Sequence, residues 1–155
     1  MSDAVLEKLV EEVVALRRRV AHLETLENPS VPKYVPLATP LTSTSFDGDA
    51  FSDTAATKID TSAVFGAPAG IKAAVVRLIA RDSGAHPQTG LHVTLSTGSD
   101  MLATAQVSVR PPGADVIVEN CGIVTCDVNG DFYYTVNASG AGTTDVWLSI
   151  VGYFI

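Results

Sequence analysis

Residues that could do chemistry are few in this sequence and do not form a known catalytic pattern. The three histidines, His22, His86 and His92, lack the spacing of a metal-binding pair such as His-Glu-x-x-His. The sequence also contains no Gly-x-Ser-x-Gly motif, which would present a nucleophilic serine, and no glycine-rich phosphate loop. We therefore predict no catalytic residues and no cofactor, and we expect a protein that is not an enzyme.

Acidic and amide side chains come together in one motif that partly resembles a calcium-binding loop. Asp127, Asn129 and Asp131 place oxygen atoms at positions 1, 3 and 5, as such loops do. The motif nevertheless has its glycine at position 4 instead of position 6, and it lacks the glutamate at position 12. We therefore predict a hairpin turn around Asn129-Gly130 and no metal site.

The two cysteines, Cys121 and Cys126, lie close together in the sequence. On one regular strand their side chains point to opposite faces, so they could not form a disulfide there. A turn or bulge at Gly122 would instead let them close a small loop. We expect two free, buried thiols, because the first residues lack the basic and apolar segments of a secretion signal and so indicate synthesis in a reducing cytoplasm.

A heptad repeat near the N-terminus is the element on which the rest of the chain depends. Apolar residues follow one another in steps of three and four, at the a and d positions of a coiled coil: Leu6, Leu9, Val13, Leu16, Val20 and Leu23. An isolated helix of this length is marginal in water, so the stripe predicts association with copies of itself. We expect a trimerisation helix over residues 1–28.

Residues 19–24 favour three parallel helices over two. Arg19-Val20-Ala21-His22-Leu23-Glu24 resembles the trimer-specifying coiled-coil motif, and this resemblance implies that Arg19 packs over the core and pairs with Glu24 of a neighbour. Valine at a with leucine at d would, on its own, favour a dimer. Packing of the helix on its own domain is the other alternative.

Composition and charge exclude several classes of partner. The chain has 155 residues, which leaves room for one ordinary domain beside the helix. Charged residues make up 17% of the sequence, the formal net charge is −7, and the mean hydropathy is +0.27. An acidic chain has no electrostatic footprint for nucleic acid or an anionic membrane, and no segment approaches the roughly 18 apolar residues of a membrane span. We expect neither partner.

Prolines separate the helix from the following domain. They occur at positions 29, 32, 36 and 40, where they stop a helix and favour extended backbone. A proline-rich connection is semi-rigid, unlike a glycine- and serine-rich tether. We therefore predict a neck over residues 29–41 that runs along the next domain.

From residue 42 the apolar residues alternate with a period of two, which predicts strands and no further helix. The clearest strand is residues 73–81, with Ala74, Val76, Leu78 and Ala80 on one face. Further strands are expected at 91–96, 103–109, 116–118, 131–137 and 145–155, and residues 47–59 are expected to form a covering loop with short strands. Glycine and proline turns between these segments predict a mainly β fold, with an antiparallel, jelly-roll-like β-sandwich over residues 42–155.

The last strand is apolar on both faces, so we expect it to be buried on two sides. Val146, Leu148 and Ile150 are predicted to face the core. The other face is either buried within the subunit or forms a head interface, and its residues are Trp147, Val151, Tyr153 and Ile155. The polar groups on tryptophan and tyrosine suit an interface that is wet at its rim.

A trimeric coiled coil, a proline-containing neck and a β head ending in an aromatic, apolar strand resemble trimeric virion proteins such as phage fibre tips, head spikes and capsid decoration proteins. This resemblance implies a non-enzymatic homotrimer in the virion, attached to other virion or surface proteins through several identical weak sites. The β part also resembles heads of the complement C1q and tumour-necrosis-factor type. The alternative is therefore a cell-surface or extracellular C1q-like or lectin-like module that binds glycan or protein.

Overall fold

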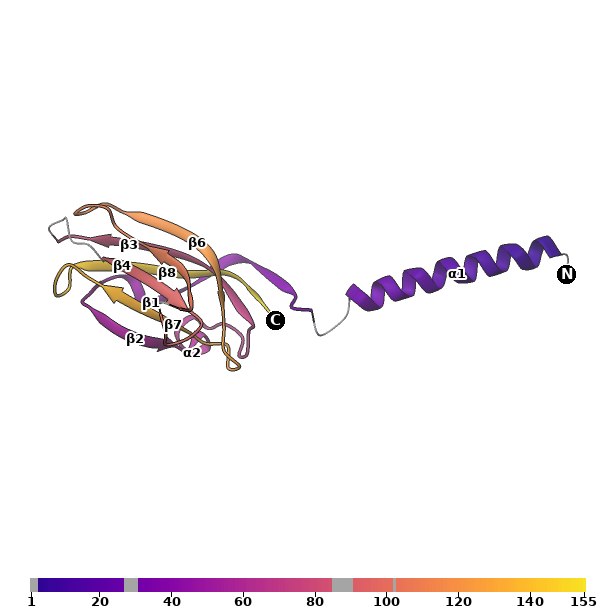
Figure 1. The fold of residues 1–155 in the computed structure, drawn as a ribbon, viewed down its shortest axis with the longest axis horizontal. Coiled ribbons are helices and arrows are strands. Elements are labelled where there is room, and N and C mark those ends of the chain that lie inside the picture. The colour runs from indigo at the N-terminus through magenta and orange to yellow at the C-terminus, as the bar shows by residue number, and fades with distance from the viewer. Residues whose placement is uncertain (1–2, 27–30, 85–90, 102) are drawn as a thin grey trace. The chain divides into compact units, whose positions relative to one another are not determined.

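The computed structural model describes residues 3–26, 31–84, 91–101 and 103–155, and within the N-terminal helix it describes the side chains of residues 8–20. The chain divides into two compact units, Met1–Pro32 and Lys33–Ile155. The first unit contains the expected helix as α1 (Asp3–Leu26) (Figure 1). All its described side chains are exposed.

The second unit is mainly β, as predicted, and its described residues form two four-stranded antiparallel sheets (Figure 1). The strands are β1 (Tyr34–Phe51), β2 (Thr54–Ile59), β3 (Ala73–Asp82), β4 (His92–Ser96), β5 (Ala105–Val109), β6 (Val118–Thr125), β7 (Phe132–Asn137) and β8 (Thr144–Phe154). One sheet has the order β1-β8-β3-β6, and the other has the order β2-β7-β4-β5.

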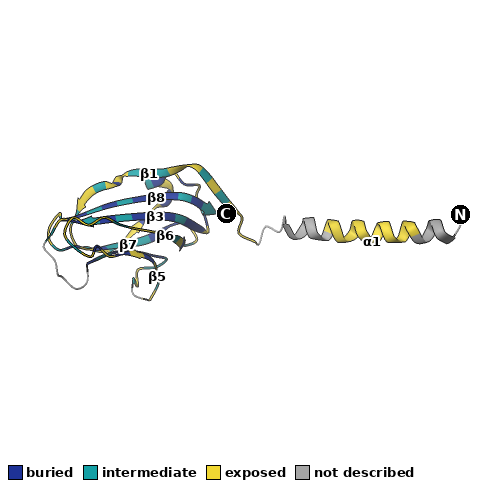
Figure 2. Ribbon diagram, turned by 90° about the horizontal axis from the view of Figure 1, so that it is seen from above, coloured by how far each residue is buried: buried dark blue, intermediate teal, exposed yellow. Residues whose placement is uncertain are grey.

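The two sheets share one hydrophobic core. In β8 the residues Val146, Leu148 and Ile150 are buried, while the residues between them are half-buried (Figure 2). In β3 the predicted inward set is buried: Ala74, Val76, Leu78 and Ala80. Side chains of the second sheet, such as Val93 and Val136, complete the same cluster. The period-two pattern therefore predicted the core face of both strands correctly.

Strand β1 begins inside the segment predicted as a neck. It pairs with β8 from Tyr34, opposite Phe154, onward, so the second half of that segment belongs to the β domain. Pro36 and Pro40 are tolerated because β1 is an edge strand, and the pairing shifts between Pro36 and Leu41. The end of β1 and the short strand β2 occupy residues 47–59, where a covering loop with short strands was expected.

A short helix, α2 (Thr61–Phe65), contradicts the prediction that no helix follows residue 41. The Asp60 side chain caps it by accepting hydrogen bonds from the backbone N–H groups of Ser62 and Ala63, at 3.0 and 2.9 Å. Gly66 ends it with a left-handed φ of 72°. The capping residues were visible in the sequence, but the segment between them is too short to show a helical period.

Candidate interaction surfaces

The apolar stripe of α1 is open to solvent in the single chain. The exposed fractions of its described members are 53% for Leu9, 44% for Val13, 58% for Leu16 and 50% for Val20. Arg19 is also exposed, whereas the side chains predicted at Leu6, Leu23 and Glu24 lie outside the described set. A continuous stripe of this kind is a surface that association would bury.

A second candidate surface is the outer face of the β1-β8-β3-β6 sheet, on the side away from the core. The strand register divides it into two halves. The entry half lies where the β unit begins and comprises Tyr34, Pro36, Ala73, Val75, Ile123, Thr125, Gly152 and Phe154. The far half comprises Asp47, Arg77, Ile79, Arg81, Glu119, Cys121, Asp145, Trp147 and Ser149.

The entry half carries no charged residue and exposes apolar side chains. Tyr34 and Ile123 are 45% and 51% exposed, and the rings of Tyr34 and Phe154 lie 5.2 Å apart between centroids. Tyr34 covers Gly152, where an added Cβ would lie 2.5 Å from the tyrosine hydroxyl oxygen. Glycine at position 152 is therefore what lets the Tyr34 ring lie flat on the sheet.

The far half is organised by ion pairs. The Arg77 guanidinium donates two hydrogen bonds to the Glu119 carboxylate, at 2.7 and 2.8 Å, and holds the pKa of Glu119 below its usual range. Arg81 pairs with Asp145, and two of its N–H groups donate to the same carboxylate oxygen. These pairs satisfy the charges of Arg77, Glu119, Arg81 and Asp145 within one chain.

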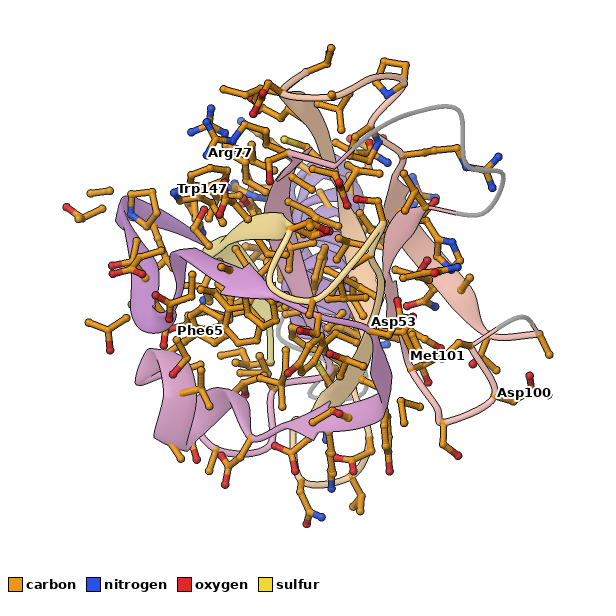
Figure 3. All side chains as sticks on the ribbon, turned by 90° about the vertical axis from the view of Figure 1, so that its left-hand side faces the viewer. Asp53, Phe65, Arg77, Asp100, Met101 and Trp147 are labelled. Atoms are coloured by element: carbon orange, nitrogen blue, oxygen red, sulfur yellow. The ribbon has the colours of Figure 1, made fainter. Side chains whose placement is uncertain are left out.

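Trp147 lies next to Arg77 on this half of the sheet (Figure 3). Gly48 of β1, with a φ of +105°, passes so close to the indole that an added Cβ would lie 2.7 Å from it. Trp147 is therefore half-buried by its own chain. Part of the flat surface of its indole ring is therefore already covered by Gly48 of the same chain.

The structure does not place the four predicted head-interface residues on one surface. Trp147 lies in the far half, Val151 is the bulge residue that the pairing with β3 skips, and Ile155 lies just beyond β8, where it is 52% exposed. Tyr153 instead packs against the core. The prediction of a shared face is wrong for Tyr153 because the pairing with β3 skips Val151, and this bulge reverses the alternation that follows it.

The acidic motif forms the predicted turn, but this turn is not a hairpin. It links β6 in one sheet to β7 in the other. The Lys58 ammonium lies 2.8 Å from the Asp127 carboxylate and 2.9 Å from that of Asp131, and hydrogen bonds to these two groups raise the pKa of Lys58. Among the described residues, no group of three or more His, Cys, Asp or Glu side chains could hold a metal ion.

An aromatic groove opens beside β1, β2, β7 and α2. Its volume is about 390 Å³. The ring centroid of Phe46 lies 5.7 Å from that of Phe51, 5.2 Å from that of Tyr134 and 5.9 Å from that of Phe65, which Figure 3 labels. Asp49 and Lys58 border the groove and add polar groups to an apolar floor.

The remaining predicted chemical groups are not gathered into a site. Cys121 and Cys126 are free, as predicted, but Cys121 is exposed and not buried, whereas burial raises the pKa of the Cys126 thiol to about 12. His92 is half-buried on β4, His86 lies outside the described residues, and so does the side chain of His22. In the part of the chain that the structure describes, no helix has the length and apolar character needed to cross a membrane.

Comparison with known proteins identifies no family for this chain. The chain matches no protein-family model, no curated protein and no solved structure. The α1 stripe, the outer face of the sheet and the aromatic groove are therefore the features from which a function can be argued.

Proposed function

We propose that the chain is the subunit of a homotrimeric, non-enzymatic structural or attachment protein, and that α1 forms a parallel three-stranded coiled coil. The observation that carries this proposal is the stripe of half-exposed a and d residues on α1: Leu9, Val13, Leu16 and Val20. Burial of such residues between parallel copies of the helix gives the stability that a single helix lacks.

Two features favour three copies over two. Arg19 begins the segment that resembles the trimer-specifying motif, and its side chain is free to reach a neighbouring helix. Val10, at the flanking e position, is 55% exposed and widens the apolar stripe. A wider stripe suits a three-helix core, in which each helix contacts two others.

We infer a jelly-roll head for this trimer. Support comes from the strand order, because β8 lies between β1 and β3 in one sheet and β7 lies between β2 and β4 in the other. This is the order of a chain that winds through two Greek keys, and virus capsid domains use such folds.

A trimeric stalk with a β head matches the plan of phage fibre tips, head spikes and capsid decoration proteins. Attachment through three identical weak surfaces would give avidity without a strong single site.

Two neighbouring valines allow a matched test of the coiled coil. Val13 is at an a position of the stripe and is 44% exposed, whereas Val14 is at the b position outside it and is 43% exposed. We expect Val13→Asp to abolish the trimer, because it places a charge in the seam, and Val14→Asp to leave the trimer intact. Native mass spectrometry of the two variants measures whether each is still a trimer. Equal effects, or the reverse order, would contradict the proposed seam.

A second candidate function, a lectin-like extracellular recognition module, is favoured by the aromatic groove. Phe51 and Tyr134 could stack on an apolar ring face, while Asp49 and Lys58 could bind hydroxyl groups at the rim. Chemical shifts of groove residues during titration with a panel of sugars would test it, with Phe51→Ala as the variant that loses binding. Capsid or tail genes beside this gene, or its detection by electron microscopy on a virus particle, would favour the virion role.

A further inference from the structure

We propose that the entry half of the outer sheet face is the surface through which the three heads contact one another. The occupant of this surface is a second copy of the same chain. This inference rests on the proposed coiled-coil trimer, and it assigns the contact to Tyr34, Val75, Ile123 and Phe154.

Chain connectivity ties the end of the β unit that carries this surface to the helix through a short segment. The β unit begins at Lys33, whose N–H donates to the Ile155 carbonyl at 3.0 Å, while the Ile155 N–H donates back at 3.1 Å. Tyr34 and Phe154, the first residues of the entry half, are paired directly beside this point. The chain from Leu26 to Lys33 spans at most roughly 25 Å, at roughly 3.6 Å per residue. Three heads on one coiled coil are therefore tethered by the end that carries the entry half.

The chemistry of the entry half suits a contact between protein subunits. Val75 pairs with Ile123 across neighbouring strands. No charge has to be desolvated when this surface is covered, in contrast to the far half with its Arg77–Glu119 and Arg81–Asp145 pairs. Interface cores are depleted in charged residues and enriched in aromatic ones.

The bulge in β8 adds an aromatic pair to this surface. Because the alternation reverses after Val151, Tyr153 turns to the core and Phe154 lies on the outer face against Tyr34. Gly152 leaves room for the Tyr34 ring. The result is an aromatic pair on the outside of the sheet, where a regular strand would have placed Tyr153. Tyrosine combines a large apolar area with a hydroxyl that can remain wet at the rim of an interface.

Threefold symmetry allows one surface near the axis to serve all three subunits. In a cyclic trimer each subunit contacts both of its neighbours. A surface that faces the axis therefore meets two equivalent surfaces at once. The far half, which lies at the other end of the same strands, is left for contacts outside the trimer.

Two exposed isoleucines provide the test in the full-length chain. Ile123 is 51% exposed and lies in the entry half, whereas Ile117, at 63%, precedes β6 and lies outside it. Dilution series followed by sedimentation equilibrium would measure the concentration at which half of the trimer dissociates. We expect Ile123→Glu to raise this concentration by about tenfold or more, as the loss of a well-packed interface residue does. Ile117→Glu should leave it unchanged.

The outcomes separate this inference from the proposed function. A wild-type chain that is monomeric at micromolar concentration overturns both proposals. A wild-type trimer in which both isoleucine variants dissociate like the wild type overturns the head contact alone. Circular dichroism checks that the variants are folded. If Ile123→Glu unfolds the head, Val75→Thr is tested in its place, because threonine keeps the shape of the valine side chain. Val75→Thr must then weaken the trimer more than Ile117→Thr does.

Discussion

The two faces of the β1-β8-β3-β6 sheet differ in how much of their side-chain surface a single chain buries. On the inner face of β8, Val146, Leu148 and Ile150 are 1%, 3% and 0% exposed, so a single chain buries this face fully. On the outer face, Trp147 and Val75 remain half-buried and Ile123 of β6 is 51% exposed. The inner face therefore supplies the stability of the head, and the outer face is available for association.

The largest expected effect comes from the inner face. Leu148→Ala should lower the free energy of unfolding of the head by about 2–5 kcal/mol, because it leaves a cavity between two sheets that share one core. Urea unfolding followed by circular dichroism measures this loss. A loss well below about 1 kcal/mol would mean that the core is not closed around Leu148.

Asp82 tests the polar end of the inner face. Its carboxylate is 1% exposed and accepts hydrogen bonds from the Gly84 N–H at 2.8 Å, the Ser139 N–H at 3.0 Å and the Thr144 hydroxyl at 2.6 Å. Asp82→Asn should cost about 1–3 kcal/mol at neutral pH, because it disrupts bonds to a buried charged group. Urea unfolding against wild type measures it, and an unchanged midpoint would contradict this role.

The same residue gives a pH dependence with a defined sign. Burial on its own raises the pKa of Asp82, but the hydrogen bonds outweigh it and hold this pKa below its usual range. A lowered folded-state pKa contributes stability above the unfolded value of about 3.9, and this contribution is lost as the pH falls below it. We expect wild type to lose stability below about pH 4 by more than Asp82→Asn does. If the unfolding free energies of the two proteins fell in parallel with pH, the lowered pKa of Asp82 would be contradicted.

Trp147→Ala should have a smaller effect on the head than Leu148→Ala. The indole is half-buried against Gly48, so about 1–2 kcal/mol of unfolding free energy is expected to be lost while the head stays folded. The trimer should persist, because Trp147 belongs to the far half. If Trp147→Ala unfolded the head and Leu148→Ala were tolerated, the two faces would be assigned the wrong way round.

The smallest effect is expected for the Arg77–Glu119 pair. Both side chains are about half exposed, so the solvent screens their interaction. Arg77→Gln and Glu119→Gln should each change the urea midpoint by no more than its experimental error. A large loss in either variant would show that the far half contributes to the stability of the head.

The sequence predicted the elements whose pattern is local. The inner faces of β3 and β8 follow from strict alternation, and α1 follows from its heptads. Strand β1 was missed because Pro36 and Pro40 argue against a strand unless it is known to be at an edge. The position of Tyr153 was missed because the bulge at Val151 depends on pairing with β3, far away in the sequence. The entry half was missed for the same reason, since Tyr34 and Phe154 meet only in the folded sheet.

The most direct test of the trimer is the mass of the native 155-residue chain in solution. Sedimentation equilibrium or native mass spectrometry at micromolar concentration should give about three times the chain mass of 16.2 kDa. Such a mass follows if the α1 stripe is buried between three parallel helices. A stable species of one chain mass would contradict the coiled coil and every interface built on it, and a species of two chain masses would contradict the threefold assembly.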